Sequence, residues 1–162
     1  ALLKTHRETF FLWVVGGPAS EVSRLQKLAR EHGLTDADIR FEGPVPSADV
    51  PAAMAAADLG VYPAPKSSDP FFHRDTSPLK LLEYMAAGLP TVSADLTPVR
   101  DLLSENETRF CAPGDSADLA RALSAALADP AGSATRAEAA QARIARLSWR
   151  ERMARITSLC SA

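Results

Sequence analysis

Residues 79–94 of the chain are LKLLEYMAAGLPTVSA, and this stretch defines a structural unit that recurs along the sequence. Its first nine residues form an apolar segment typical of a helix, which Gly88 and Pro90 then end. The TVSA segment that follows is short and β-branched, as expected for a strand. A helix that leads directly into a buried strand is typical of a parallel α/β sheet.

The same alternation continues through the first two thirds of the chain. Short apolar runs rich in β-branched and aromatic residues predict strands at residues 10–15, 39–42, 59–62, 91–94 and 109–112. Longer amphipathic segments predict helices at residues 21–32, 50–57, 79–87, 118–128, 135–147 and 149–159. The predicted fold class is therefore α/β. We expect a Rossmann-like parallel sheet of five to six strands with helices on both faces, plus a C-terminal helical tail.

The amino end and the last third of the chain carry further expectations. Residues 1–8 resemble the last half of a helix with no start signal, so we expect the chain to be a fragment of a longer protein. Residues 131–146, rich in alanine and arginine, are expected to form a solvated helix with weak ties to the core. Trp149 is expected to pack the tail helix.

Composition excludes several classes of protein. A chain of 162 residues, 46% hydrophobic, can bury a core that needs neither disulfides nor metal. Its 18 basic and 20 acidic residues give a net charge of −2, which provides no overall attraction for nucleic acid or an anionic membrane. No apolar run approaches the ~20 residues of a transmembrane segment. Cys111 and Cys160 lie far apart, which indicates reduced thiols in a cytoplasmic protein, and no histidine has metal-binding spacing.

Residues 63–90 carry the strongest functional signal. A strand ends here in a polar loop, and Ser77 followed by Pro78 then predicts a helix with Ser77 as its N-cap. Because Pro78 has no N–H, the free amides of the first turn would be those of Leu79 and Lys80. These amides point out of the helix start together with the positive end of its dipole. The sequence therefore predicts an anion site at the carboxyl edge of the sheet.

Glu83 shares a helical face with Leu79 and Lys80 and lies roughly 6 Å further along the axis than Leu79. A carboxylate repels phosphate, so Glu83 fits this site only if it accepts hydrogen bonds from neutral hydroxyls. A ribose attached to a diphosphate offers two hydroxyls, which favours a nucleoside diphosphate lying along the first turns. The alternative is that Glu83 simply faces water, and the residue pattern favours neither. Arg74, Lys66 and Lys80 are the cations near enough in sequence to assist a diphosphate.

Several motifs, in order, resemble the retaining glycosyltransferases of family 4. Asp75 and Glu83 are separated by seven residues, and Glu83 begins EYMAAGLPTV, which is similar to the E-x7-E segment of that family. Further similar segments are LWVVGGP at residues 12–18, IRFEGPVP at 39–46, ADLGVYP at 57–63 and SWRE at 148–151. The resemblance covers essentially the whole chain.

This resemblance implies a two-domain glycosyltransferase-B fold, of which residues 1–162 would be the single donor-binding domain without its first strand and the N-terminal acceptor domain. It implies that Glu83 holds the ribose hydroxyls, that Asp75 faces the donor sugar, and that backbone amides between them meet the diphosphate. The glycine loop of Gly16 and Gly17 would let the backbone approach the nucleotide, and the loop with Val45 would line the base. The predicted site is Asp75 for catalysis and Gly16, Gly17, Val45, Arg74, Ser77, Leu79, Lys80 and Glu83 for the nucleotide sugar, with no metal or cofactor.

Two residues depart from the family pattern. Asp75 is one methylene shorter than the usual glutamate, and Pro78 stands where many members have glycine. The basic pair that neutralises the leaving diphosphate in the family would precede Ala1, so this chain alone is not expected to catalyse. We expect a retaining transferase that uses a UDP or GDP sugar. The alternatives are a nucleotide-sugar 2-epimerase-like isomerase and a non-catalytic nucleotide-binding module.

Overall fold

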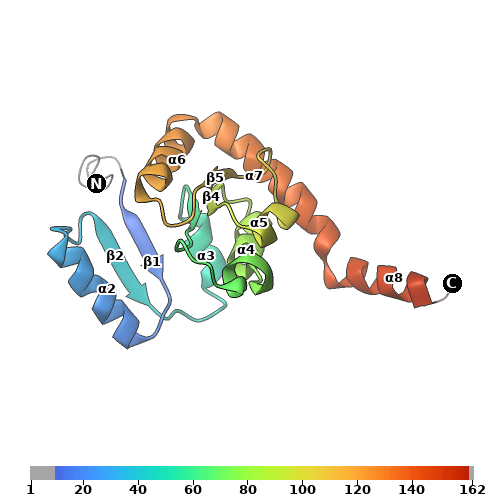
Figure 1. Ribbon diagram of the computed structural model, residues 1–162, viewed down its shortest axis with the longest axis horizontal. Coiled ribbons are helices and arrows are strands. Elements are labelled where there is room, and N and C mark those ends of the chain that lie inside the picture. Colours follow the sequence, from blue (N-terminus) through green and yellow to red (C-terminus); the bar gives the residue numbers. More distant parts are fainter. Residues whose placement is uncertain (1–9, 161–162) are drawn as a thin grey trace. The chain divides into compact units, whose positions relative to one another are not determined.

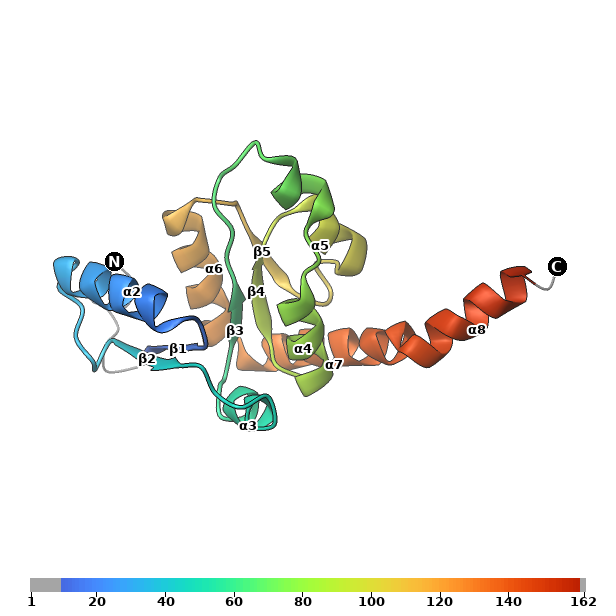
Figure 2. The ribbon, with the colours of Figure 1, turned by 90° about the horizontal axis from the view of Figure 1, so that it is seen from below.

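The computed structural model describes residues 10–160 (Figures 1 and 2). The helix expected at residues 1–8 lies outside the described residues. The chain divides into two compact units, Ala1–Ala52 and Ala53–Ala162. In each unit the strands are parallel and helices flank them, so the predicted α/β class is confirmed. The described residues contain five strands, in one sheet of two and one of three.

Unit 1 is a single strand–helix–strand crossover. Strand β1 (Leu12–Val15) pairs in parallel with β2 (Ile39–Gly43), and α2 (Ala19–Glu31) connects them. The turn before β2 is fixed by the buried carboxylate of Asp38, which accepts 2.8 Å hydrogen bonds from the amide and the hydroxyl of Thr35. Because β1 and β2 run parallel, both strands end at the same edge of this sheet, and the helix provides the crossover that a parallel pair needs.

Unit 2 contains a three-stranded parallel sheet in the order β3-β4-β5. Figure 2 shows helix α6 on one side of this sheet and α4 and α5 on the other. All four residues of β4 are buried, as expected for the central strand of a sheet covered on both faces. The elements of this unit are β3 (Gly60–Tyr62), α4 (Leu79–Ala87), β4 (Thr91–Ala94), α5 (Thr97–Leu102), β5 (Arg109–Cys111) and α6 (Ser116–Ala128). Helix α3 (Val50–Ala55) contains the boundary between the two units.

The core of unit 2 has two clusters of buried side chains. The first brings α4, the end of β4, α5 and α7 (Pro130–Ile144) together, through Leu81, Met85, Ala94, Leu96, Val99, Leu103 and Ala140. The second joins β4 and β5 to α6, through Val92, Cys111, Ala122 and Ala126. Small residues on α6 let that helix approach the sheet closely, while α4 contributes larger side chains.

Helix α7 (Pro130–Ile144) corrects the expectation of a solvated helix with weak ties. It begins five residues earlier than predicted, because Asp129 caps it by accepting a 2.9 Å hydrogen bond from the Gly132 amide. Ser133, Ala137 and Ala140 are buried, so the alanine-rich face packs on the core. The small side chains that suggested weak packing are what allow this close approach.

The remaining differences concern short or terminal helices. Sequence reasoning missed α5 and η1 (Phe71–Asp75), a single π-helical turn. After η2 (Ala145–Leu147), helix α8 (Trp149–Cys160) extends beyond α7 in Figure 1. Trp149 is 75% exposed and stacks with Arg152 at 5.2 Å, so the expectation that it packs the tail helix is wrong. No helix in the described part of the chain has both the length and the apolarity needed to cross a bilayer.

The packing of α7 predicts a specific loss of stability. Replacing Ala140 with leucine should lower the free energy of unfolding by about 1–3 kcal/mol, because the larger side chain overpacks the first cluster. Ala134→Leu, on the exposed face of the same helix, should change it by less than about 0.5 kcal/mol. Urea unfolding of both variants tests this, and equal midpoints for the two would show that α7 is not anchored to the core.

Candidate functional site

Helix α4 presents one face to the core and the predicted site residues on the other. Leu81 and Met85 are 0% and 1% exposed, which fixes the rotation of the helix about its axis. Leu79, in contrast, is 60% exposed, and the side chains of Lys80 and Glu83 are 61% and 43% exposed. The Lys80 ammonium donates a 2.8 Å hydrogen bond to the Glu83 carboxylate. The three residues therefore share the exposed face that their spacing predicts, and Glu83 has a cation beside it.

The start of α4 differs from the predicted Ser77 cap. The helix begins at Leu79 with Pro78 as its N-cap residue, and no side chain caps it. Pro78, at φ −79° and ψ 59°, turns the chain so that the Leu79 amide donates a 2.8 Å bond to the Ser77 carbonyl. The prediction that the Leu79 amide is free is therefore wrong. Within residues 10–160 the Lys80 amide has no protein partner, so one outward-pointing donor of the predicted pair remains.

Helix α6 also begins at the carboxyl edge of this sheet, but its first turn is already occupied. The Asp115 carboxylate accepts 2.9 Å bonds from the amides of Ala117 and Asp118. Asp118 in turn accepts a 2.7 Å bond from the Ala112 amide, which together with its bond to Arg121 lowers the pKa of this carboxyl. A carboxylate already stands where an anion would bind, so α6 is not suited to phosphate. Between the starts of α4 and α6, α4 is the one that no side chain caps.

The segment between β3 and α4 carries Asp75 and Arg74. Asp75 ends η1, and its carboxylate accepts a 2.9 Å bond from the neighbouring Arg74 side chain. Both side chains are mainly exposed, at 53% and 79%. Arg74 thus screens Asp75, and a π-helical turn of this kind is frequent at functional sites.

The three remaining predicted residues lie in unit 1, at the carboxyl ends of its strands. Gly16 and Gly17 follow β1 with φ values of +104° and +87°, a region that other residues adopt only with strain. A Cβ atom at either glycine would meet no atom within 4 Å, so the space beside this loop is open. Val45 lies half-buried after β2, and the Gly16 amide joins the two loops by a 2.7 Å bond to the Gly43 carbonyl.

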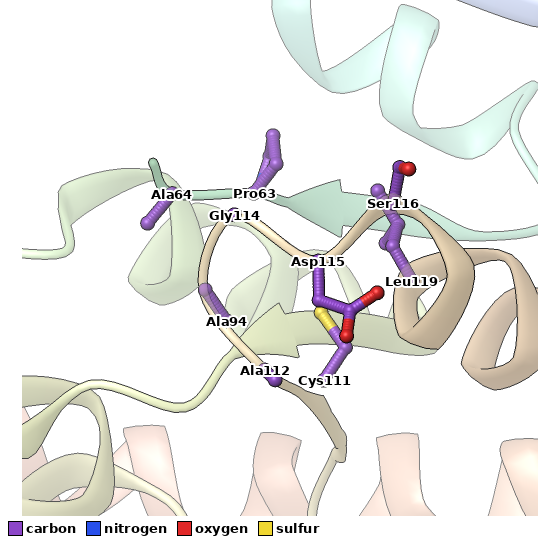
Figure 3. A pocket seen from close by; sticks show the side chains of 9 residues that line it. All are labelled: Pro63, Ala64, Ala94, Cys111, Ala112, Gly114, Asp115, Ser116 and Leu119. Carbon is purple, nitrogen blue, oxygen red and sulfur yellow. The ribbon is translucent and has the colours of Figure 1, made fainter. Parts of the chain in front are cut away.

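A cavity of about 190 Å³ lies at the carboxyl ends of β3, β4 and β5 (Figure 3). Most of the residues that line it are small or apolar, including Pro63, Ala94, Cys111 and Leu119. None of the nine predicted site residues lines it. A neighbouring hollow that shares the Gly114 loop includes Lys66, one of the cations considered from the sequence. The cavity therefore belongs to a different part of the sheet edge from the exposed face of α4.

Sequence reasoning missed an ion-pair network next to the end of β4. The Arg100 guanidinium donates two 2.7 Å hydrogen bonds to Asp95 and one of 2.9 Å to Glu105, and it stacks 3.6 Å from the Phe110 ring centroid. The bonds from Arg100 lower the pKa of Asp95. Thr97-Pro98 was the available signal, because it has the same hydroxyl–proline pattern that marked the start of α4. This network links the end of β4 to α5 and leaves Arg100 unavailable to a ligand.

The described residues offer no cluster of three or more histidine, cysteine or acidic side chains that would hold a metal ion. The predicted site residues of unit 2 supply amide donors, cations and carboxylates: the Lys80 amide, the Lys80 and Arg74 side chains, and the Glu83 and Asp75 carboxylates. Such a set can bind an anion and hydroxyl groups side by side.

Parallel strands whose helices start at one edge define a Rossmann-like α/β domain, and comparison with known proteins identifies its family. The sequence profile of the glycosyl transferases group 1 matches residues 1–129, and the chain belongs to this family. It is 31% identical over 144 residues to the glycogen synthase of Mycobacterium tuberculosis, a match that covers 88% of this chain and 32% of that protein. It is 44% identical over 90 residues to the phosphatidyl-myo-inositol mannosyltransferase of Mycobacterium leprae, covering 55% and 22%.

Solved structures show the same fold. The sucrose-phosphate synthase of Thermosynechococcus elongatus superposes with a TM-score of 0.76 at 22% identity, covering 99% of this chain and 40% of that one. HepE of Anabaena, in complex with UDP and glucose, superposes with a TM-score of 0.74 at 25% identity, covering 99% and 44%. The chain thus spans less than half the length of these relatives, and it matches the Rossmann-like part of a glycosyltransferase-B fold.

The contact of α4 with β3 predicts an effect of Gly60→Ala. A Cβ atom at Gly60 would lie 2.9 Å from the Tyr84 ring and 3.1 Å from Leu89, so the substitution should cost about 1–3 kcal/mol of unfolding free energy. In a Tyr84→Leu background the same substitution should cost less, because the ring edge is gone. Urea unfolding of the double-mutant cycle tests this. Strictly additive effects would show that the ring and the strand are not in contact.

The environment of Cys111 predicts slow alkylation. Burial, and then the nearby carboxylates of Asp118 and Asp95, raise the pKa of this thiol, which is 4% exposed. Because the thiolate is the reactive form, iodoacetamide should modify Cys111 at least about tenfold more slowly in the folded protein than in guanidinium. Mass spectrometry of the Cys111 peptide over time measures this. Equal rates in the two conditions would contradict the buried position.

Proposed function

We propose that this chain is the donor-binding domain of a longer retaining glycosyltransferase of family 4, which takes a sugar from a nucleoside diphosphate sugar. Membership of the group 1 family and the D-x7-E spacing of Asp75 and Glu83 support the proposal. The observation that carries it is the start of α4: an uncapped helix end with an unpaired Lys80 amide and with Lys80 and Glu83 on its exposed face.

In this proposal the diphosphate binds at the first turn of α4. The Lys80 amide and the positive end of the helix dipole attract it, and the Lys80 and Arg74 side chains add positive charge. Leu79 contributes as part of the exposed first turn, and the Ser77 hydroxyl, which makes no capping bond, is a further donor. In this proposal these groups supply the positive charge that binds the diphosphate, and no metal ion is needed.

Glu83 accepts hydrogen bonds from the two ribose hydroxyls. Its ion pair with Lys80 makes this placement compatible with a diphosphate nearby, because the ammonium lies beside the carboxylate at 2.8 Å and reduces its repulsion of the phosphates. Gly16 and Gly17, beside which the space is open, and the half-buried Val45 are also assigned to nucleotide binding in this proposal.

Asp75 faces the donor sugar and holds its hydroxyl groups. During transfer the bond between the anomeric carbon and the phosphate oxygen breaks, and negative charge moves onto the departing diphosphate. The amide and the basic side chains at α4 stabilise this charge as it develops, and a positioned donor of this kind lowers the barrier most effectively when water is excluded. The acceptor hydroxyl oxygen then forms the new bond on the same face of the sugar while its proton passes to the departing diphosphate oxygen, so the configuration is retained.

The rest of the protein supplies the acceptor side. The chain corresponds to 32% of the length of the related glycogen synthase, so we assign acceptor binding and the remaining diphosphate-neutralising cations to an N-terminal domain outside these 162 residues. UDP in the HepE complex supports a UDP or GDP sugar as the donor. The free cysteines Cys111 and Cys160 support a cytoplasmic location.

Substitution of Glu83 tests the proposal in the full-length protein. Glu83→Ala should weaken UDP or GDP binding about ten- to a hundredfold, because charged hydrogen bonds contribute about 1.5–3 kcal/mol. Glu138→Ala, an exposed residue of α7, is the matched control and should bind like the parent. Isothermal titration measures the affinities. Parental affinity and turnover in Glu83→Ala would show that the ribose lies elsewhere, and an epimerised nucleotide sugar formed without acceptor would indicate the isomerase instead.

A further inference from the structure

Lys80 and Glu83 form an ion pair on the outer face of α4. The Lys80 ammonium donates a 2.8 Å hydrogen bond to Oε2 of Glu83. Both side chains are exposed, and within residues 10–160 neither has another side-chain partner. The burial of Leu81 and Met85 fixes the rotation of α4, which keeps both charged groups on its outer face. One oxygen of the Glu83 carboxylate is therefore already engaged by a cation of the same helix.

This ion pair competes with the hydroxyl groups that Glu83 is proposed to bind. Two neighbouring hydroxyl groups pair with a carboxylate when each of its oxygens accepts one hydrogen bond. In the ion pair, Oε2 of Glu83 accepts its hydrogen bond from Lys80 instead. A ribose that binds alone must displace the ammonium from this oxygen, and the ammonium then has only water as a partner. The affinity of Glu83 for a neutral diol is therefore lowered by the strength of the pair.

A diphosphate at the first turn of α4 gives the ammonium a different anion to bind. The Lys80 amide, which has no protein partner within residues 10–160, is the donor assigned to the diphosphate. The ammonium belongs to the same residue and ends a flexible four-carbon stem, so it reaches the same phosphate oxygens without movement of the helix. Charge-assisted hydrogen bonds of this kind are strong. The diphosphate therefore draws Lys80 away from Glu83, and both carboxylate oxygens become available to the ribose.

We propose that Lys80 exchanges Glu83 for the phosphates when the donor binds, so that the site selects ligands in which a diphosphate and a ribose diol are joined. This inference rests on the proposed function, because it uses the same assignment of the diphosphate and the ribose. Lys80 is then a specificity-determining residue, which strengthens the binding of a nucleoside diphosphate and weakens that of a nucleoside. Asp75 has the same kind of partner, since Arg74 donates a 2.9 Å hydrogen bond to it.

Substitution of Lys80 tests the exchange in the full-length protein, with uridine and UDP as the two probes. Lys80→Met should tighten uridine binding about two- to fivefold, because the ribose no longer has to break an exposed ion pair. The same variant should weaken UDP binding at least about threefold, because the phosphates lose a charged donor. NMR titration measures both affinities. Effects of opposite sign cannot come from a loss of folded protein, which would weaken the binding of both probes.

Two variants provide matched controls. Lys27 forms an exposed ion pair with Glu31 at 3.9 Å, so Lys27→Met removes an equivalent charge from α2, a helix without predicted site residues. This variant should bind uridine and UDP with the parental affinities. Lys80→Arg retains the positive charge beside Glu83 and should keep the parental preference for UDP over uridine.

Uridine binding that is unchanged or weaker in Lys80→Met would overturn the inference, and so would parental affinity of that variant for UDP. The Glu83→Ala variant separates this inference from the proposed function. If Glu83→Ala weakens UDP binding but Lys80→Met does not tighten uridine binding, the donor site stands and only the exchange is refuted. If the parent does not bind UDP, or if Glu83→Ala binds it with the parental affinity, both are refuted.

Discussion

The candidate site depends on the burial of Leu81 and Met85 in the core of unit 2. These two side chains, one helical turn apart, are almost completely buried, so α4 has a single rotational setting. That setting places Leu79, Lys80 and Glu83 on the outer face and holds the uncapped helix start at the carboxyl edge of the sheet. A rotation that moved Glu83 inward would bury a carboxylate and expose two large apolar side chains, and both changes are unfavourable.

Small residues on the neighbouring elements make this setting possible. Gly60 leaves room on β3 for the Tyr84 ring, and Ala140 lets α7 approach α4 from the other direction. The Gln141 side chain adds a 3.2 Å hydrogen bond to the Ala86 carbonyl near the end of α4. The helix is thus held by its middle and its last turn, while its first turn stays free to meet a ligand. A rigid element with one open end is a suitable support for a binding site.

The sequence predicted most of this fold because its strands are short apolar runs bounded by residues that end helices or strands, such as glycine and proline. The strand at residues 91–94 and the helix at 79–87 have the predicted bounds, since Gly88 and Pro90 allow no other boundary. Helix α7 was misjudged because alanine is equally compatible with a solvated face and with close packing, and only its neighbours decide. The N-cap of α4 is Pro78 and not the predicted Ser77, because the turn at Pro78 depends on backbone angles that residue types alone do not determine. The shared face of Lys80 and Glu83 followed from their spacing, but the Arg100 network depends on the relative placement of β4 and α5.

The same physical features explain why one helix start is suited to an anion and another is not. Helix α6 carries its own carboxylate, Asp115, at its first turn, whereas α4 has none. The central claim is that a nucleoside diphosphate binds along the first turns of α4. A crystal structure of the full-length protein with UDP tests this most directly. The account predicts both ribose hydroxyls within hydrogen-bond distance of the Glu83 carboxylate and the diphosphate at the Lys80 amide. A UDP bound elsewhere, with Glu83 still paired only to Lys80, would contradict it.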